Sequence, residues 1–247
     1  MSYSDKAALR GEPSYVWRSG QERRLQMLAK WAKLDDAYVL DAGGGNGTYA
    51  SQIQRRYQPK QVELFEIEFE RVQEARAEHI DNALVAAGEY LPYKTNTFDT
   101  IISNEVIEHV QDDKMAVSEM VRTLKIGGRL FIFCPNRWYP FEQHGHYWRG
   151  KYYFGNTPLI NYLPTTLRDK LAPHVKAYTR RDVRALFDDL PVIIQHHSRI
   201  YGGYDNLIPR LGKPMEIFRE FLYSLEDSIF DTWGLSHFLV VEKVDNR

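Results

Sequence analysis

Cysteine and long apolar runs are both scarce in this sequence. Cys134 is the single cysteine among 247 residues, which excludes an internal disulfide framework and favours a reducing compartment such as the cytoplasm. No apolar run approaches the roughly twenty residues that span a bilayer, and residues 1–14 lack the apolar stretch of a signal peptide. We therefore expect a soluble, cytoplasmic protein without a membrane span.

Charge of one sign is not in excess either. Lysine and arginine together number 32, and aspartate and glutamate number 33, so the chain has no overall positive field that would attract a polyanion. We expect no nucleic-acid partner, although Arg180 and Arg181 could form a local basic patch. The hydrophobic fraction of 43% is ample for a buried core, and the composition is typical of a globular enzyme.

Strand-like segments alternate with helix-like ones along most of the chain. Apolar residues at helical spacing predict an amphipathic helix over residues 20–34. The segments that follow are predicted as strands at 38–41, 61–65, 83–86, 100–103, 129–134, 192–197 and 237–244, and as helices after the glycine-rich turn at 43–47 and at 68–79, 112–124 and 179–190. This alternation predicts an α/β protein with a Rossmann-like, doubly wound sheet that is mostly parallel and has helices on both faces. We expect the C-terminal strand to be antiparallel, and Gly127-Gly128 to stop the preceding helix before a buried strand.

The alternation is interrupted twice. Residues 135–178 are rich in aromatic side chains without a clear strand–helix pattern, and residues 202–235 contain an apolar stripe at helical spacing. We predict a single domain over residues 1–247, with a helical segment at 1–36, a ligand-binding core at 37–135 and two insertions. Because ligands of such folds bind beyond the carboxyl ends of the strands, both insertions are expected to cover the active-site edge.

A glycine-rich turn joins the first strand to the next helix. The turn, Gly43 to Gly47, would let a nucleotide-like ligand lie directly against the backbone. The dinucleotide fingerprint would place its third glycine where Thr48 stands. Asp41 would repel a phosphate, whereas it suits a ligand that carries an ammonium group and a sulfonium centre. The turn therefore predicts a cationic or neutral ligand, with an ordinary tight turn as the alternative.

A second carboxylate closes the next strand. Glu66 lies roughly twenty residues after the turn, the spacing from which an acid can accept hydrogen bonds from both ribose hydroxyls. The alternative is a solvated acid at a strand end, because other glutamates crowd the same region.

At these residues the chain resembles the class I S-adenosylmethionine-dependent methyltransferases, in particular the branch related to the ubiquinone and menaquinone biosynthesis methyltransferases. The likeness runs in order from Val39 to Pro135 through the blocks VLDAGGGNGTYA, LFEIE, GEYLPYKTNTFDTIISNEVIEHV and MVRTLKIGGRLFIFCPN. The resemblance implies that the cofactor is S-adenosyl-L-methionine. The cofactor-binding residues that it implies are Asp41, Gly43, Gly45, Gly47, Glu66, Ile67, Gly88, Glu89 and Asn104.

The roles that the resemblance implies differ along the chain. The glycine turn would hold the methionyl part of the cofactor, Glu66 the ribose, and Asn104 would face the methionine moiety. Gly88 and Glu89 would flank the adenine. The family often has an acidic residue just before this segment, but Ala87 and Gly88 stand there, so a backbone contact to the adenine is expected.

Candidate residues for the acceptor side lie in the first insertion. His144 is the candidate catalytic base, because a histidine can remove a proton from an acceptor hydroxyl near neutral pH. Alternate spacing places His144 and His146 on one side of an extended segment near Glu142, but two histidines and one acid do not make a metal site, so no metal is expected. The segment from Glu105 to His109 also matches the family, and we predict that it caps or braces the strand-to-helix turn. His196 and His197 are interpreted as surface or core residues.

We expect an enzyme that transfers a methyl group from S-adenosyl-L-methionine to a small-molecule acceptor, such as a hydroxyl of a sugar, quinone, lipid or secondary metabolite. The alternatives are an RNA or protein methyltransferase, a nicotinamide-dependent oxidoreductase, and a protein that binds the cofactor without turnover. The glycine spacing and Asp41 disfavour the oxidoreductase. The sequence specifies no oligomeric state.

Overall fold

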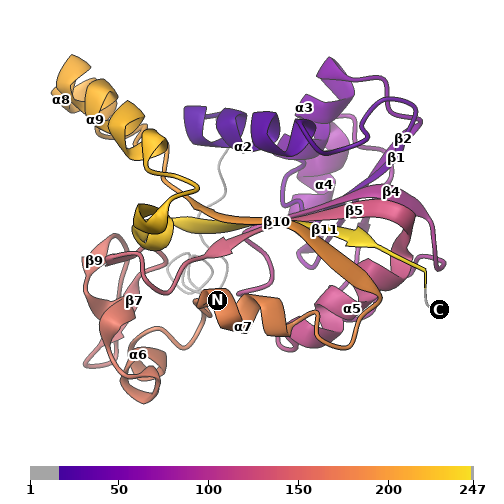
Figure 1. Cartoon of the computed structure of the whole chain (residues 1–247). Helices are drawn as coiled ribbons and strands as arrows, with labels where there is room; N and C mark the ends of the chain where they lie inside the picture. Colours follow the sequence, from indigo (N-terminus) through magenta and orange to yellow (C-terminus); the bar gives the residue numbers. More distant parts are fainter. Residues whose placement is uncertain (1–16, 246–247) are drawn as a thin grey trace.

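A seven-stranded sheet organises residues 17–245, the part of the chain that this computed structural model describes (Figure 1). Its strands, in spatial order, are β10 (Val192–Ile200), β11 (Ser236–Lys243), β5 (Leu124–Pro135), β4 (Phe98–Asn104), β1 (Tyr38–Ala42), β2 (Gln61–Glu66) and β3 (Ala83–Val85). β11 runs antiparallel to both of its neighbours, while the pairs from β5 to β3 are parallel. The predicted doubly wound sheet with an antiparallel C-terminal strand is confirmed.

The strand order reverses next to β1. From β1 the chain builds outward through β2 and β3, and then returns to the other side of β1 with β4 and β5. In open parallel sheets such a reversal leaves a crevice beyond the carboxyl ends of the central strands. Ligand-binding residues are therefore expected at the carboxyl ends of β1, β2 and β4.

Helices cover both faces of the sheet (Figure 1). The core on one face contains residues of α2 (Ser19–Ala29), α3 (Thr48–Arg56) and α4 (Phe69–Ala77), and the core on the other contains residues of α5 (Asp113–Thr123) and α7 (Arg180–Ala185). Neighbouring strand residues alternate between the two cores: Ile101 packs into the second and Ile102 into the first. Each such buried aliphatic side chain stabilises the fold by roughly 1.5–3 kcal/mol, which explains why the strand positions could be read from apolar runs.

The predicted helix stop at Gly127-Gly128 is wrong. The helix ends at Thr123, and the chain enters β5 at once, because Leu124 already has an extended conformation (φ −72°, ψ 139°). The glycine pair instead lies within β5, where the register against β4 is irregular. A Cβ atom on Gly128 would lie 2.9 Å from the carbonyl oxygen of Lys125, so the glycine permits a close backbone approach in this irregular stretch.

The two predicted insertions extend from the same end of the sheet (Figure 1). The elements of the first are β6 (Phe141–Glu142), β7 (His146–Trp148), β8 (Lys151–Tyr153), β9 (Thr157–Pro158), η1 (Ile160–Tyr162) and α6 (Thr165–Leu171). The elements of the second are α8 (Ile208–Leu211), α9 (Lys213–Ser224) and η2 (Ile229–Trp233). On α9, Met215 is buried, whereas Phe218 and Phe221 are about half exposed. Within residues 17–245, no helix has the length and apolar character needed to cross a bilayer.

Candidate active site

The glycine turn forms a tight backbone loop between β1 and α3. Gly43, Gly45 and Gly47 have φ angles of 65°, 58° and 80°, a region that side chains other than glycine rarely adopt. A Cβ atom on Gly43 would lie 2.6 Å from Cγ1 of Val106. Around Gly45, by contrast, the nearest atom to such a Cβ is a guanidinium nitrogen of Arg71 at 3.8 Å. The loop is therefore restricted to glycine for local steric reasons, and its backbone at Gly45 is not covered by packed side chains.

Glu66 is bound to this loop. Its carboxylate accepts hydrogen bonds from the backbone N–H groups of Gly45 (3.1 Å), Ile67 (2.7 Å) and Glu68 (3.2 Å). An ionised carboxylate offers about four acceptor positions, so capacity for a further donor remains. The buried Glu66 side chain is thus fixed at the end of β2, the position that the sequence predicted, and it contacts the glycine loop. Its contact with a ribose stays a prediction.

Asp41 supports the loop from the other side. Its Oδ2 accepts a hydrogen bond from the N–H of Ala50 in α3 (3.1 Å), and the side chain is buried. Burial raises the pKa of Asp41 to about 7, the Ala50 N–H opposes this shift, and the negative charge of Glu66 adds to it. The structure therefore places two interacting carboxyl groups around the loop, and a nearby cation would favour the ionised form of Asp41.

One basic residue near the loop was missed by the sequence reasoning, which considered only the segment next to the turn. Arg71 reaches the loop from α4, and its Nε lies 2.8 Å from Oε2 of Glu68. Its charge is therefore shared with a buried acid, which reduces its attraction for a phosphate.

Gly88 and Glu89 lie in the loop between β3 and β4. Glu89 accepts hydrogen bonds from the N–H groups of Gln111 (2.9 Å) and Asp112 (3.2 Å), just before α5. Its carboxylate therefore joins this loop to the start of α5. A Cβ atom on Gly88 would lie 3.5 Å from Ala116, in ordinary contact. The contact of this segment with an adenine stays a prediction.

Asn104 ends β4 and is held by the N-terminal helix. Arg24 of α2 donates a hydrogen bond to Oδ1 of Asn104 (2.6 Å) and forms an ion pair with Glu105 (2.8 Å). The guanidinium also lies over the ring of Phe133, 5.0 Å from its centre. Arg24 was not predicted as a site residue. The feature of the sequence that could have identified it is a charged residue directly before Leu25, one of the buried apolar residues of α2.

The loop after β4 contains two interacting glutamates, of which Glu108 is buried and Glu105 is partly buried. Glu105 has a left-handed backbone conformation (φ 56°), which is strained for a residue with a side chain. Burial opposes its ionisation, but Arg24, followed by His144, Glu108 and Ser236, brings the pKa of Glu105 to about 2. Burial and the charge of Glu105 raise the pKa of Glu108 well above its ordinary value. Glu105 braces the turn through Arg24 and Ser236, in agreement with the predicted role of this segment.

The first insertion brings His144 to this loop. The His144 and His109 rings lie edge to face, with centroids 5.3 Å apart. Nδ1 of His144 lies 3.1 Å from Oε1 of Glu142, whose other oxygen pairs with the buried Arg168 at 2.9 Å. Burial opposes the ionisation of Glu142, but His144 and Arg168 bring its pKa to about 2. The buried ion pair therefore fixes the histidine that the sequence named as a candidate base.

The other histidines have separate surroundings. Nδ1 of His146 lies 3.0 Å from the Thr157 hydroxyl, and its ring stacks on Tyr153. His197 is buried in the sheet, where its Nε2 lies 3.0 Å from Nδ1 of His237. His197 is thus a core residue, one of the two interpretations that the sequence offered.

Two surface hollows lie near the amino ends of the strands, on the side of the sheet away from the glycine loop. The larger, about 540 Å³, is lined by residues such as Lys60, Gln61 and Asn82, and the smaller, about 200 Å³, by residues such as Lys33 and Asp99. Neither contains the glycine loop or its carboxylates. The chemistry of the residues, rather than the size of a hollow, therefore locates the candidate site at the carboxyl ends of β1, β2 and β4.

Comparisons with known proteins agree with this location. A family model described as "Methyltransferase domain" matches residues 40–132. The ubiquinone/menaquinone biosynthesis C-methyltransferase of Saccharophagus degradans is 35% identical over 102 residues, which cover 38% of this chain and 41% of that protein. A ubiquinone biosynthesis O-methyltransferase of Xylella fastidiosa is 32% identical over 120 residues, 46% of this chain and 48% of the relative. The chain thus spans less than half the length of these curated relatives.

Solved structures extend the likeness to the whole fold. An S-adenosylmethionine-dependent methyltransferase from Mesorhizobium loti superimposes with a TM-score of 0.64 at 16% identity, covering 91% of this chain and 98% of that one. The geranyl diphosphate C-methyltransferase of Streptomyces coelicolor, solved with Mg²⁺, geranyl diphosphate and S-adenosyl-L-homocysteine, has a TM-score of 0.61 at 16% identity over 91% of this chain and 79% of that one. At these identities the likeness establishes the fold. A methyltransferase domain therefore matches residues 40–132 of this chain. Around that domain the chain is similar to ubiquinone and menaquinone biosynthesis methyltransferases, and its fold is that of the solved methyltransferases named above.

Proposed function

We propose that this protein transfers a methyl group from S-adenosyl-L-methionine to a small-molecule acceptor, namely a hydroxyl of a quinone-like ring, sugar, lipid or secondary metabolite. One observation carries the proposal: Asp41 and Glu66, both buried, flank a glycine loop whose backbone is open at Gly45. Two carboxyl groups beside such a loop complement a cationic nucleoside better than a polyphosphate.

The residues around the loop fit this cofactor. Glu66 has acceptor capacity for ribose hydroxyls beyond its three backbone donors. Asp41 supplies negative charge close to where the methionyl part would lie against Gly43 and Gly45. Ile67 follows Glu66 and is 59% exposed, so it offers apolar surface next to the ribose position.

The bound cofactor supplies a methyl group on a sulfonium, and the sulfur keeps the electron pair of the bond that breaks when the acceptor oxygen takes the methyl carbon. The protein has to place the acceptor in line and allow its proton to leave. His144 is the candidate to take that proton, because Glu142 orients its ring through Nδ1. Asn104, at the tip of β4, would face the methionine moiety, with Gly88 and Glu89 beside the adenine.

The insertions at residues 135–178 and 202–235 are proposed to cover the acceptor. They follow the carboxyl ends of β5 and β10, two strands that run in the same direction as β1, so they lie at the end of the sheet where the glycine loop follows β1. The first insertion exposes Trp138, Phe141 and Tyr153 to between 40 and 46%, and such rings can pack on a planar acceptor or on a sugar face. The two curated relatives are named for ubiquinone and menaquinone biosynthesis, and we extend a quinone-like acceptor to this chain as part of the proposal. A cytoplasmic location also stays a prediction.

Methyl transfer is tested with methyl-labelled S-adenosyl-L-methionine and separate pools of hydroquinones, sugars, lipids, RNA and protein. We expect label in a small-molecule pool, and no label with the Gly43→Ala variant. Label found only in RNA or in protein would show that the acceptor is a macromolecule and would contradict the small-molecule proposal. A wild-type protein that binds the cofactor but labels none of the pools nor a metabolite extract would contradict the proposed activity.

A further inference from the structure

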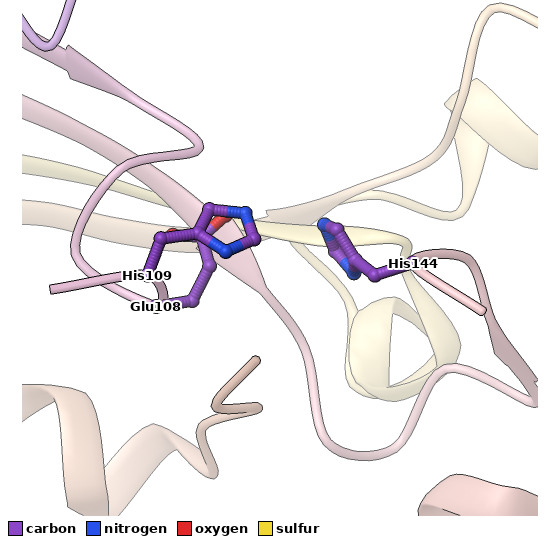
Figure 2. Close-up of side chains that lie close together, drawn as sticks. All are labelled: Glu108, His109 and His144. Atoms are coloured by element: carbon purple, nitrogen blue, oxygen red, sulfur yellow. The ribbon is translucent and has the colours of Figure 1, made fainter. Parts of the chain in front are cut away.

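Three potential metal ligands meet between the loop after β4 and the first insertion. Glu108 and His109 belong to the loop, and His144 lies between β6 and β7. One ligand atom from each of the three lies within 4.8 Å of the others. Figure 2 shows the two rings facing each other, with the Glu108 carboxylate beside His109. The tertiary fold therefore builds a cluster of two imidazoles and one carboxylate from segments that are far apart in the sequence.

The imidazole rings of His109 and His144 both have Nδ1 turned away from the cluster. Nδ1 of His109 lies 3.3 Å from the backbone carbonyl oxygen of His174, and Nδ1 of His144 lies 3.1 Å from the Glu142 carboxylate. Each of these oxygens can only accept, so each ring donates a proton from Nδ1. The lone pair of each neutral ring is then on Nε2. Metal-binding histidines are typically fixed in this way by a carbonyl or carboxylate on the far nitrogen.

The third side chain, Glu108, is buried without a hydrogen-bond donor among residues 17–245. Glu108 is only 2% exposed, and neither of its carboxylate oxygens receives a hydrogen bond from any residue within 17–245. Nε2 of His109 lies 4.0 Å from its Oε1, and the carboxyl group of Glu105 is a second, negatively charged neighbour. A buried carboxylate without donors is costly unless a cation or a proton compensates it. The neighbouring Glu105 is already engaged by Arg24 and Ser236.

We propose that Glu108, His109 and His144 bind one divalent transition-metal ion, such as Zn²⁺ or Mn²⁺. Two imidazole nitrogens and one carboxylate oxygen suit these cations and leave coordination positions for an outside oxygen. This replaces the expectation that the chain has no metal site. It also excludes His144 as the base while the metal is bound, because the Nε2 lone pair then belongs to the metal.

The site would select acceptors that carry a metal-binding oxygen. The cluster adjoins Asn104 and Glu105 at the carboxyl end of β4, so a bound cation would hold the acceptor beside the cofactor and would favour release of its hydroxyl proton to solvent water. This role rests on the proposed methyltransferase function, whereas the metal site itself does not.

Metal binding is tested on the full chain after removal of metals by chelation. Zn²⁺ and Mn²⁺ are titrated by calorimetry, Co²⁺ is titrated by its visible absorption, and bound metal is counted by elemental analysis. Glu108→Gln and His144→Ala each remove one proposed ligand. His146→Ala is the matched control, because it removes a histidine of the same insertion whose Nδ1 contacts Thr157. Circular dichroism and S-adenosyl-L-homocysteine affinity are measured on every variant.

We expect one metal ion per chain in the wild type and in His146→Ala, with affinity at least tenfold weaker in Glu108→Gln and His144→Ala while S-adenosyl-L-homocysteine affinity stays within twofold. Wild-type protein that binds none of the three metals would overturn the proposal, and so would ligand variants that bind them like the wild type. Wild-type protein that binds a metal ion but not S-adenosyl-L-homocysteine would contradict the proposed function. It would still support the metal site.

Discussion

The glycine-loop region and the first insertion, which we propose as the cofactor side and the acceptor side, are built on different principles. On the cofactor side, Asp41, Glu66 and the glycine loop sit at the ends of two adjacent parallel strands and are joined by backbone hydrogen bonds. On the acceptor side, buried side chains from distant segments meet, as in the pair of Glu142 with Arg168. The family model ends at residue 132, before the first insertion begins.

This difference indicates which part of the function is shared with relatives. A ligand common to many enzymes can be bound by backbone geometry and two acids, which persist as a short motif. An acceptor that differs between enzymes requires side chains placed by the insertions. We therefore expect the two sides to respond separately to substitution.

The largest effect is expected from the ion pair of the first insertion. Arg168 is 2% exposed, pairs with Glu142 and donates to the carbonyl oxygen of Val175. Arg168→Met removes the cationic partner of the buried Glu142 carboxylate and leaves His144 beside it; breaking a buried ion pair in this way typically costs about 3–5 kcal/mol. Limited proteolysis should then cut within residues 135–178, whereas the exposed Lys170→Met control on α6 should resist like the wild type. S-adenosyl-L-homocysteine affinity should stay within threefold; equal loss of this affinity would show that the two sides are not separable.

A smaller, purely local effect is expected at the glycine loop. Gly43→Ala introduces a Cβ 2.6 Å from Val106 at a φ of 65°, so the loop has to shift, and we expect cofactor affinity to fall about 100-fold, or ~3 kcal/mol. Gly127→Ala is the control, because its φ is 77° but no atom lies within 4 Å of the added Cβ. Calorimetry that gives the two variants the same affinity would remove the loop from the site.

The loss of one charge should have a more modest consequence. Glu66→Gln removes a charged acceptor but keeps the shape of the side chain, so we expect cofactor affinity to fall about tenfold, or ~1.4 kcal/mol. Glu63→Gln, on the same strand, should bind like the wild type. A Glu66→Gln protein with unchanged affinity would rule out the proposed ribose contact.

The positions of the glycine turn, Asp41 and Glu66 at strand ends could be predicted from the sequence for a physical reason. Strand ends and the glycine turn are local features, and parallel pairing brings the end of β2 next to the end of β1 without further information. The Gly127-Gly128 helix stop was predicted wrongly because a glycine pair also serves an irregular strand pairing. Arg24, Arg71 and the meeting of His109 with His144 depend on how separate elements pack, which no local pattern encodes.

The smallest effect concerns pH. Because burial raises the pKa of Asp41 to about 7, the group is increasingly protonated below that pH, and a bound cation would lower this pKa. Affinity for S-adenosyl-L-methionine should therefore be highest above pH 7 and decline below it, by at most about tenfold per pH unit. Calorimetry from pH 5.5 to 8.5 should give a flatter profile for Asp41→Asn. If the Asp41→Asn protein had the same pH profile as the wild type, the pH dependence would come from another group.

The most direct test of the central claim is calorimetric titration of the purified protein with S-adenosyl-L-methionine, S-adenosyl-L-homocysteine and NAD. The carboxylate-flanked loop predicts micromolar binding of the first two and no binding of NAD. Binding of NAD alone would contradict the account.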